Sequence, residues 1–135
     1  MSHLTTMTTQ LTDTDALRAA LADVGYREVE VHDQPQPLYG YQGDQRADRA
    51  HVIVRRKHVG RLSNDIGFRR QDDGNFRAVI SDYDRAKHDE RWLGRLTARH
   101  AYHLTTKTLA TQGFDVVNET TGRDGTVRMV LRRFR

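Results

Sequence analysis

The 135-residue sequence contains no cysteine. This absence excludes disulfide bonds, thiol nucleophiles and metal centres held by cysteine. The sequence also lacks any apolar run close to the roughly 18 residues that a membrane-spanning helix needs. No basic segment followed by an apolar stretch occurs at the N-terminus, so no secretory signal is expected. Together these absences predict a cytoplasmic protein with no membrane partner.

Charged residues are plentiful by contrast, since they make up 30% of the chain and hydrophobic residues only 36%. The net charge of +4 invites a nucleic-acid partner. However, nearly all basic residues are arginine, and no block of five or six like charges occurs, so the basic balance alone is weak evidence. The length predicts one domain, residues 1–135, that buries about 68–70% of the surface exposed in the unfolded chain.

Local signals predict two helices. Residues 13–24 form one helix, since Thr12 or Asp13 can cap its first turn, apolar residues repeat at helical spacing, and Gly25 ends it. Residues 89–112 form a longer helix that Gly113 closes. We expect the apolar faces of these helices to pack on a sheet.

Alternating and β-branched segments predict the strands. The Asp-Gly pair in Gln71-Asp72-Asp73-Gly74 predicts a hairpin, and Arg123-Asp124-Gly125 predicts a second one. Residues 33–38 hold both prolines, Pro35 and Pro37, and are expected to form an ordered loop. The expected strands are residues 4–11, 26–32, 50–56, 65–70, 75–81, 114–120 and 126–134.

This order of elements predicts an α+β fold, in which two helices pack on one face of an antiparallel sheet, related to the ferredoxin-like plan. The buried side chains are expected to include Leu17, Leu21, Phe68, Leu96 and Leu104.

Short motifs occur along the chain in a fixed order. They are Met1-Ser2-His3-Leu4-Thr5-Thr6, Tyr39-Gly40-Tyr41-Gln42-Gly43, Asp65-Ile66-Gly67-Phe68, Ala101-Tyr102-His103 and the segment from Asp124 to Arg132. In this order they resemble the family of hypothetical chloroplast open reading frame thirty-five, or domain of unknown function twelve-fifty-seven. The resemblance implies an adaptor or accessory subunit of an AAA-type ATPase. Its candidate motif residues are His3, Asp65, Gly67 and Tyr102.

Histidines are the candidates for metal binding. His100 and His103 lie three residues apart in the predicted long helix, near enough to share an ion. No third ligand and no HExxH pattern accompany them, and the helical wheel turns His100 toward the core. His3 could bind copper weakly or could be hydrogen-bonded within the sheet. We expect structural roles, with no metal and no cofactor.

No catalytic constellation is evident in the sequence. The glycine-rich segment from Tyr39 to Asp44 lacks a phosphate-binding pattern and is expected to form a tight turn with Tyr39 and Tyr41 against the sheet edge. Asp65 shows no positioned partner, while Gly67 marks a place of close packing. Asp82 and Asp84 are expected to be helix caps or solvated charges. The chain is therefore not expected to be an enzyme.

A row of arginines suggests an interaction surface. Alternation places Arg128 and Arg132 on one face of the last strand, and Arg55 and Arg69, with Arg77, on the same open face of the sheet. An exposed row of this kind could contact a protein or a nucleic acid.

The sequence leaves three functions open. We expect first a non-enzymatic protein-binding partner, next an RNA- or DNA-binding module that uses the arginine-bearing sheet, and last a histidine-based metal protein or enzyme.

Overall fold

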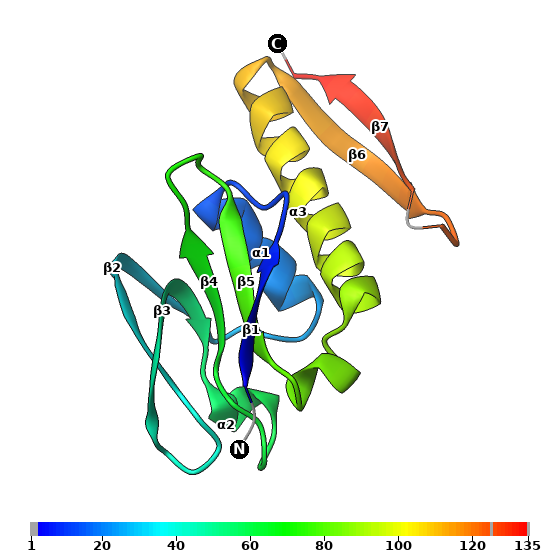
Figure 1. The fold of residues 1–135 in the computed structure, drawn as a ribbon. Helices are drawn as coiled ribbons and strands as arrows, with labels where there is room; N and C mark the ends of the chain where they lie inside the picture. Colours follow the sequence, from blue (N-terminus) through cyan, green and yellow to red (C-terminus); the bar gives the residue numbers. More distant parts are fainter. Residues whose placement is uncertain (1–2, 125, 135) are drawn as a thin grey trace.

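The computed structural model describes residues 3–124 and 126–134, which form one five-stranded antiparallel sheet and one separate two-stranded hairpin (Figure 1). The sheet has the strand order β1-β5-β4-β3-β2. Its strands are β1 (Leu4–Thr8), β2 (Glu30–Tyr39), β3 (Gln45–Val54), β4 (Ile66–Arg70) and β5 (Phe76–Ser81). The hairpin consists of β6 (Phe114–Thr121) and β7 (Val127–Arg133).

Two helices, α1 (Thr14–Asp23) and α3 (Glu90–Thr111), pack together and against one face of the sheet (Figure 1). The Asp13 and Asp89 carboxylates accept hydrogen bonds from the first turns of α1 and α3, and the cap at Asp13 was predicted. The shorter helices are α2 (Arg56–Val59) and the 3-10 turn η1 (Asp84–Ala86). The predicted α+β class and its helices on one face are confirmed. None of the described helices has a segment long and apolar enough to cross a lipid bilayer.

The main core lies between the helices and the sheet. Leu17, Leu21, Phe68 and Leu96 are fully buried there, as predicted. Leu104 is only half-buried, so the prediction for this residue is wrong. The reason is length: 22 helical residues span roughly 33 Å, whereas strands of five or six residues span only about 17–20 Å. The C-terminal half of α3 therefore extends past the sheet.

A second, smaller core lies on the opposite face of the sheet. Leu38 and Ala50, from the β2–β3 hairpin, pack there against Ile53 and Val79. A β-carbon on Gly67 would lie only 2.6 Å from Ala50 Cβ and 2.9 Å from Leu38 Cδ1. Any side chain at this position would collide with both residues, so the expectation of close packing at Gly67 is confirmed.

The two prolines lie within β2, so the prediction of a loop over residues 33–38 is wrong. β2 is an edge strand of the sheet, and one side of its backbone needs no hydrogen bonds. The pairing with β3 also shifts register between Val31 and Gln36, which accommodates Pro35 in a bulge. Proline thus marks the edge of this sheet and does not end the strand.

The β6–β7 hairpin stands apart from the five-stranded sheet and lies along the protruding end of α3 (Figure 1). In the part of the chain that the structure describes, β6 and β7 pair with each other and with no strand of the main sheet. The prediction that Arg128 and Arg132 share a sheet face with Arg55 and Arg69 is therefore wrong. We call the hairpin and the part of α3 from Ala98 onward the arm.

Candidate functional site

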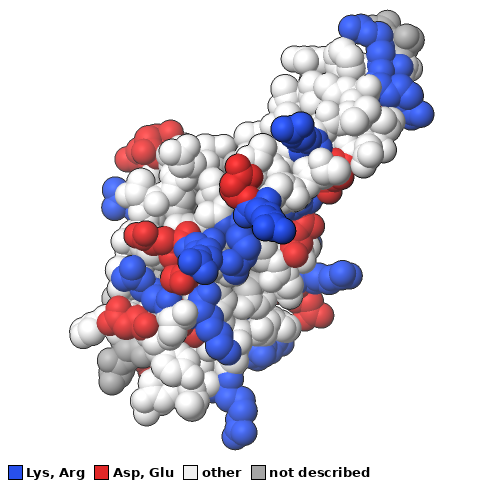
Figure 2. All heavy atoms as spheres, turned by 90° about the vertical axis from the view of Figure 1, so that its right-hand side faces the viewer, with Lys and Arg blue, Asp and Glu red and all other residues white. Residues whose placement is uncertain are grey.

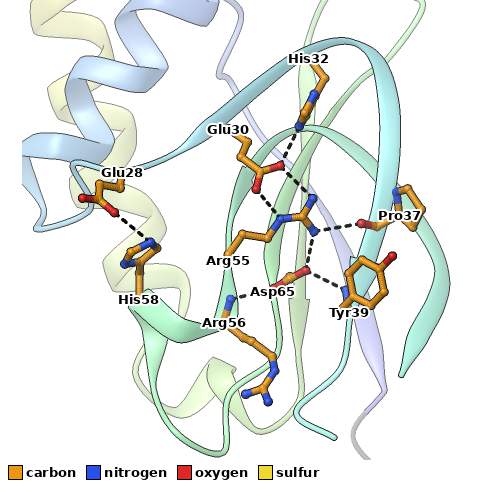
Figure 3. A network of polar contacts seen from close by, with 9 residues as sticks. All are labelled: Glu28, Glu30, His32, Pro37, Tyr39, Arg55, Arg56, His58 and Asp65. Atoms are coloured by element: carbon orange, nitrogen blue, oxygen red, sulfur yellow. Dashed lines mark hydrogen bonds and ion pairs between the residues drawn. The ribbon is translucent and has the colours of Figure 1, made fainter. Parts of the chain in front are cut away.

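Asp65 lies directly before β4 and is the centre of a polar network (Figure 3). Its side chain is only 1% exposed. Its Oδ2 accepts hydrogen bonds from the Tyr39 backbone N–H (2.7 Å) and from Arg55 Nη1 (2.8 Å). Its Oδ1 accepts one from the Arg56 backbone N–H (2.7 Å). The expectation that Asp65 lacks a positioned partner is wrong, because Arg56, Arg55 and Tyr39 lie 9, 10 and 26 residues away in the sequence and meet Asp65 only in the fold.

Arg55 continues this network toward β2. Its Nε and Nη2 atoms donate to the two Glu30 carboxylate oxygens, at 2.7 and 2.8 Å, and Nη1 also donates to the Pro37 carbonyl oxygen at 3.1 Å. These bonds from Arg55, with a further contact from His32, lower the pKa of Glu30 to about 2. The Arg55 guanidinium is thus used within the molecule, and its predicted role on an interaction surface has no support from this geometry.

A second buried network adjoins the first. The Asp84 carboxylate accepts hydrogen bonds from the Asn64 backbone N–H (2.9 Å) and from Ser81 Oγ (2.7 Å). Asn64 Oδ1 in turn accepts one from the Tyr41 backbone N–H at 3.0 Å. Asp84 is therefore buried, and the expectation of a cap or a solvated charge is wrong for this residue. Tyr41 is half-buried in the turn that joins β2 to β3, as expected of a tight turn.

Hydrogen bonds in these two networks connect the β2–β3 turn to the segment before β4. Each carboxylate in them is held by N–H or O–H donors, and their described residues include neither a thiol nor an unpaired histidine. A carboxylate held in this way stabilises the fold and is poorly placed to take a proton from a substrate. The arrangement fits a structural role better than a catalytic one.

The three histidines named as candidates lie in different surroundings. His100 is buried, as predicted, and its Nε2 accepts hydrogen bonds from the backbone N–H groups of Thr12 (3.3 Å) and Asp13 (3.1 Å). His103 instead contacts Asp23 through Nε2, at 2.6 Å. The His3 carbonyl accepts from the Asp82 N–H, while its side chain is exposed. Among the described residues, no three histidine or carboxylate side chains are grouped as metal ligands would be.

A fourth histidine, His88, was not identified from the sequence. It is buried in front of α3, where Nδ1 donates to the Asp84 carbonyl oxygen (3.1 Å) and Nε2 lies 2.6 Å from the Tyr26 hydroxyl. Its ring packs edge-on against the Trp92 ring, with 4.7 Å between the ring centroids. In the sequence, His88 stands between Lys87 and Asp89, directly before the predicted helix. Charged neighbours of this kind occur around buried and exposed histidines alike, so they do not predict that His88 is buried.

Burial makes the stability of the protein sensitive to mildly acidic pH. Desolvation lowers the pKa of both His88 and His100 below the usual 6.5. The unfolded chain therefore binds more protons than the folded one below about pH 6.5, and the free energy of unfolding falls as the pH drops through this window. The carboxylates with lowered pKa, such as Glu30, lose their contribution only at lower pH, below about 4.5.

We expect urea denaturation to show decreasing stability between about pH 7.5 and about pH 5.5. Replacement of His100 by Gln, which can still accept hydrogen bonds, is expected to make this decrease shallower. Leu62→Ser, which changes an exposed side chain that does not titrate, is the control and should leave the pH dependence as it is. An unchanged slope in His100→Gln would contradict a neutral, buried His100.

Two hollows lie along α3 on the side of the hairpin. One hollow of about 490 Å³ is lined by Tyr102, Thr105 and Leu109 of α3 and by Met129 and Leu131 of β7. A second hollow, of about 810 Å³, lies toward the start of α3. Tyr102, one of the motif residues, thus lies at a surface that the hairpin only partly covers.

The remaining arginine candidates are divided between two places. Arg69 and Arg77 lie directly opposite each other on β4 and β5 and are exposed. Arg128 and Arg132 lie on the face of β7 opposite to Met129 and Leu131, which line the smaller hollow. Arg132 forms an ion pair with Asp115 at 3.1 Å. Tyr39 is partly exposed beside Arg55, whose guanidinium lies 5.7 Å from the ring centroid.

One signal in the sequence was missed. Residues 90–135 contain nine basic and four acidic side chains, whereas residues 1–89 contain thirteen and fourteen. The positive charge therefore belongs to α3 and the hairpin. Figure 2 views the molecule from this side and shows several basic side chains gathered in the middle of the face, with acidic ones beside them. Counting charge by segment would have located this region.

The fold and its surfaces define a small α+β protein with a helix-backed antiparallel sheet and a projecting helix–hairpin arm. Residues 20–130 match the family described as "Protein of unknown function (DUF1257)", and the chain belongs to that family. It is also similar to "Uncharacterized protein ycf35" of Cyanophora paradoxa, with 25% identity over 100% of this chain and 99% of that protein. The protein with the same description from Guillardia theta is 27% identical, again over 100% and 99% of the two chains. No solved structure matches the chain.

Proposed function

We propose that the chain is a small non-enzymatic partner protein that binds another protein through its arm. The observation that carries this proposal is exposed apolar surface on the hairpin. Among the described residues, four of the eight exposed large hydrophobic side chains lie on this short segment, each 42–55% exposed. They are Val117, Val130, Leu131 and Phe134.

The stability of the hairpin supports the same proposal. A two-stranded sheet is only marginally stable by itself in water. In the described part of the chain, β7 pairs with β6 alone, so the backbone groups along its other edge have no strand partner. A bound protein would cover the apolar side chains and provide partners for this edge.

The other two functions have less support from the geometry. The arginines that were expected to form one surface for RNA or DNA lie on two separate sheets. One of them, Arg55, is bound to Glu30 and Asp65. A histidine-based metal site or active centre would need ligands that converge, whereas His100 and His103 contact different groups. The family resemblance suggests an AAA-type ATPase as the partner of an adaptor or accessory subunit.

Affinity purification from the native host with mass spectrometry tests this proposal. The bait is compared with a variant in which Val130 and Leu131 are both serine, and with a control variant in which Leu62 and Tyr83, exposed apolar residues outside the arm, are serine. We expect a specific partner to be lost at least about tenfold from the arm variant and retained by the control, because serine would give up the apolar area that a bound partner buries.

The captured protein is then produced separately and its affinity for the three baits is measured by calorimetry. An AAA-type ATPase that binds in this arm-dependent way would support the family-based expectation. A partner that binds both variants equally well would contradict the proposed role of the arm. A nucleic acid recovered in place of a protein would favour the second function.

A further inference from the structure

The two hollows beside α3 form one continuous groove. The residues that line both of them are Ala98, from the middle of α3, and Val127, from the start of β7. The groove runs along most of the helix, from Arg91 at one end to Leu109 at the other. Small-molecule sites usually have volumes of about 300–1,000 Å³. The two hollows, of about 810 and 490 Å³, together exceed this range and can hold a segment of polypeptide.

The lining of the groove changes character along its length. On α3 it is formed by residues three or four positions apart, which make one stripe on the helix surface. The stripe begins with Arg91 and Arg95, continues with the small Ala98, and ends with Tyr102, Thr105 and Leu109. One end is therefore cationic and the other is apolar.

The cationic end has charge to offer to a ligand. Arg91 and Arg95 of α3 and Arg123 of the hairpin turn are all exposed, and none forms an ion pair within 4 Å with a residue that the structure describes. Arg99, by contrast, is bound to Asp23 at 2.8 Å and lies 3.8 Å from Glu119. Three guanidinium groups are thus available at the same end of the groove, and carboxylates are the protein groups that they bind best.

We infer that this groove binds an amphipathic segment of a partner protein that is acidic at one end and apolar at the other. Its carboxylates would lie against Arg91, Arg95 and Arg123, and its apolar side chains would pack on Leu109 and Leu131. This inference rests on the proposed function, because it specifies the chemistry of the protein that the arm binds.

Other occupants fit the groove less well. A second copy of this chain, docked symmetrically through the same surface, would place two positively charged arms against each other. A nucleic acid carries phosphates along its whole length, whereas the apolar end of the groove, at Leu109 and Leu131, is lined by no basic side chain among the described residues that could bind them. The one tryptophan, Trp92, is 4% exposed and cannot serve as a stacking platform for bases.

A binding titration by fluorescence anisotropy tests the inference. The probe is a labelled synthetic peptide with a glutamate-rich first half and a second half of leucine and threonine. The comparison probes are the same peptide with lysine in place of glutamate, and a single-stranded oligouridylate. The protein variants are Arg91→Ala with Arg95→Ala, and a control with Arg69→Ala and Arg77→Ala, which removes equal charge from the main sheet.

We expect the acidic peptide to bind and the lysine peptide not to bind. The Arg91/Arg95 variant should weaken binding about tenfold, since each exposed ion pair contributes up to about fivefold in affinity. The Arg69/Arg77 control should stay within about twofold of the native chain, and raising the salt from about 50 to about 300 mM should weaken the native interaction. Circular dichroism checks that both variants are folded.

Three outcomes would overturn the inference: no binding of the acidic peptide, equal weakening by the two double variants, or tighter binding of oligouridylate than of the peptide. The same variants are also titrated with the partner obtained by affinity purification. If Val130→Ser with Leu131→Ser abolishes that interaction and Arg91→Ala with Arg95→Ala leaves it intact, the proposed function stands and the acidic segment is wrong. If neither change matters, the proposed function fails as well.

Discussion

Replacing Asp65 with alanine is expected to destabilise the folded protein by about 3–5 kcal/mol. The side chain is almost completely buried and accepts hydrogen bonds from Arg55 and from the backbone N–H groups of Tyr39 and Arg56. Its removal would leave two N–H groups without their acceptors and take one carboxylate from the Arg55 guanidinium. The loss exceeds that of an exposed ion pair, because little water reaches these groups to replace the carboxylate.

Urea denaturation monitored by circular dichroism measures this effect. Asp33→Ala is a suitable control, since Asp33 is exposed on β2 and should change the stability by no more than about 0.5 kcal/mol. Asp65→Asn keeps the shape of the side chain and one carbonyl oxygen, so we expect an intermediate loss. If Asp65→Ala proved as stable as the control, the network in Figure 3 would contribute nothing to folding.

Replacing Leu96 with alanine should cost about 2–5 kcal/mol. Leu96 is fully buried where α3 meets the sheet, in the same core as Leu17 and Phe68. Alanine would leave a cavity among close-packed side chains, which the helix and the strands around it can close only in part. The same urea experiment measures the loss.

Arg95→Ala is the matched control for this change, because Arg95 precedes Leu96 and points to solvent. We expect it to alter the stability by less than about 0.5 kcal/mol. A loss below about 1 kcal/mol for Leu96→Ala would mean that this face of α3 contributes little to the core.

Elements with strong local signals could be predicted from the sequence. The ends of α1 and α3 follow from Asp13 and Asp89, whose carboxylates cap the first turns, and from glycines directly after the last turns. The β4–β5 hairpin follows from Asp73-Gly74, since Gly74 adopts a positive φ of 89° there. In each case a few adjacent residues determine the backbone conformation, so no knowledge of distant contacts is needed.

Predictions that depended on distant contacts were less successful. Pro35 and Pro37 predicted a loop, but β2 forms an edge of the sheet and tolerates them. Asp84 was expected near solvent, yet the donors of Asn64 and Ser81 permit its burial. Whether a proline or a carboxylate fits depends on what lies opposite in space, which the neighbouring residues in the sequence do not specify.

By itself, the sequence determined the α+β class, the helix ends, the central hairpin and the family to which the chain belongs. It also determined the concentration of positive charge after residue 89, because charge is a property of composition. Only the tertiary structure decided that the last two strands leave the sheet, that Arg55 binds Glu30 and Asp65, and that α3 and β7 enclose a groove. The physical reason is that capping and turn formation act between neighbours, whereas a buried ion pair or a groove requires residues from separate elements to meet in space.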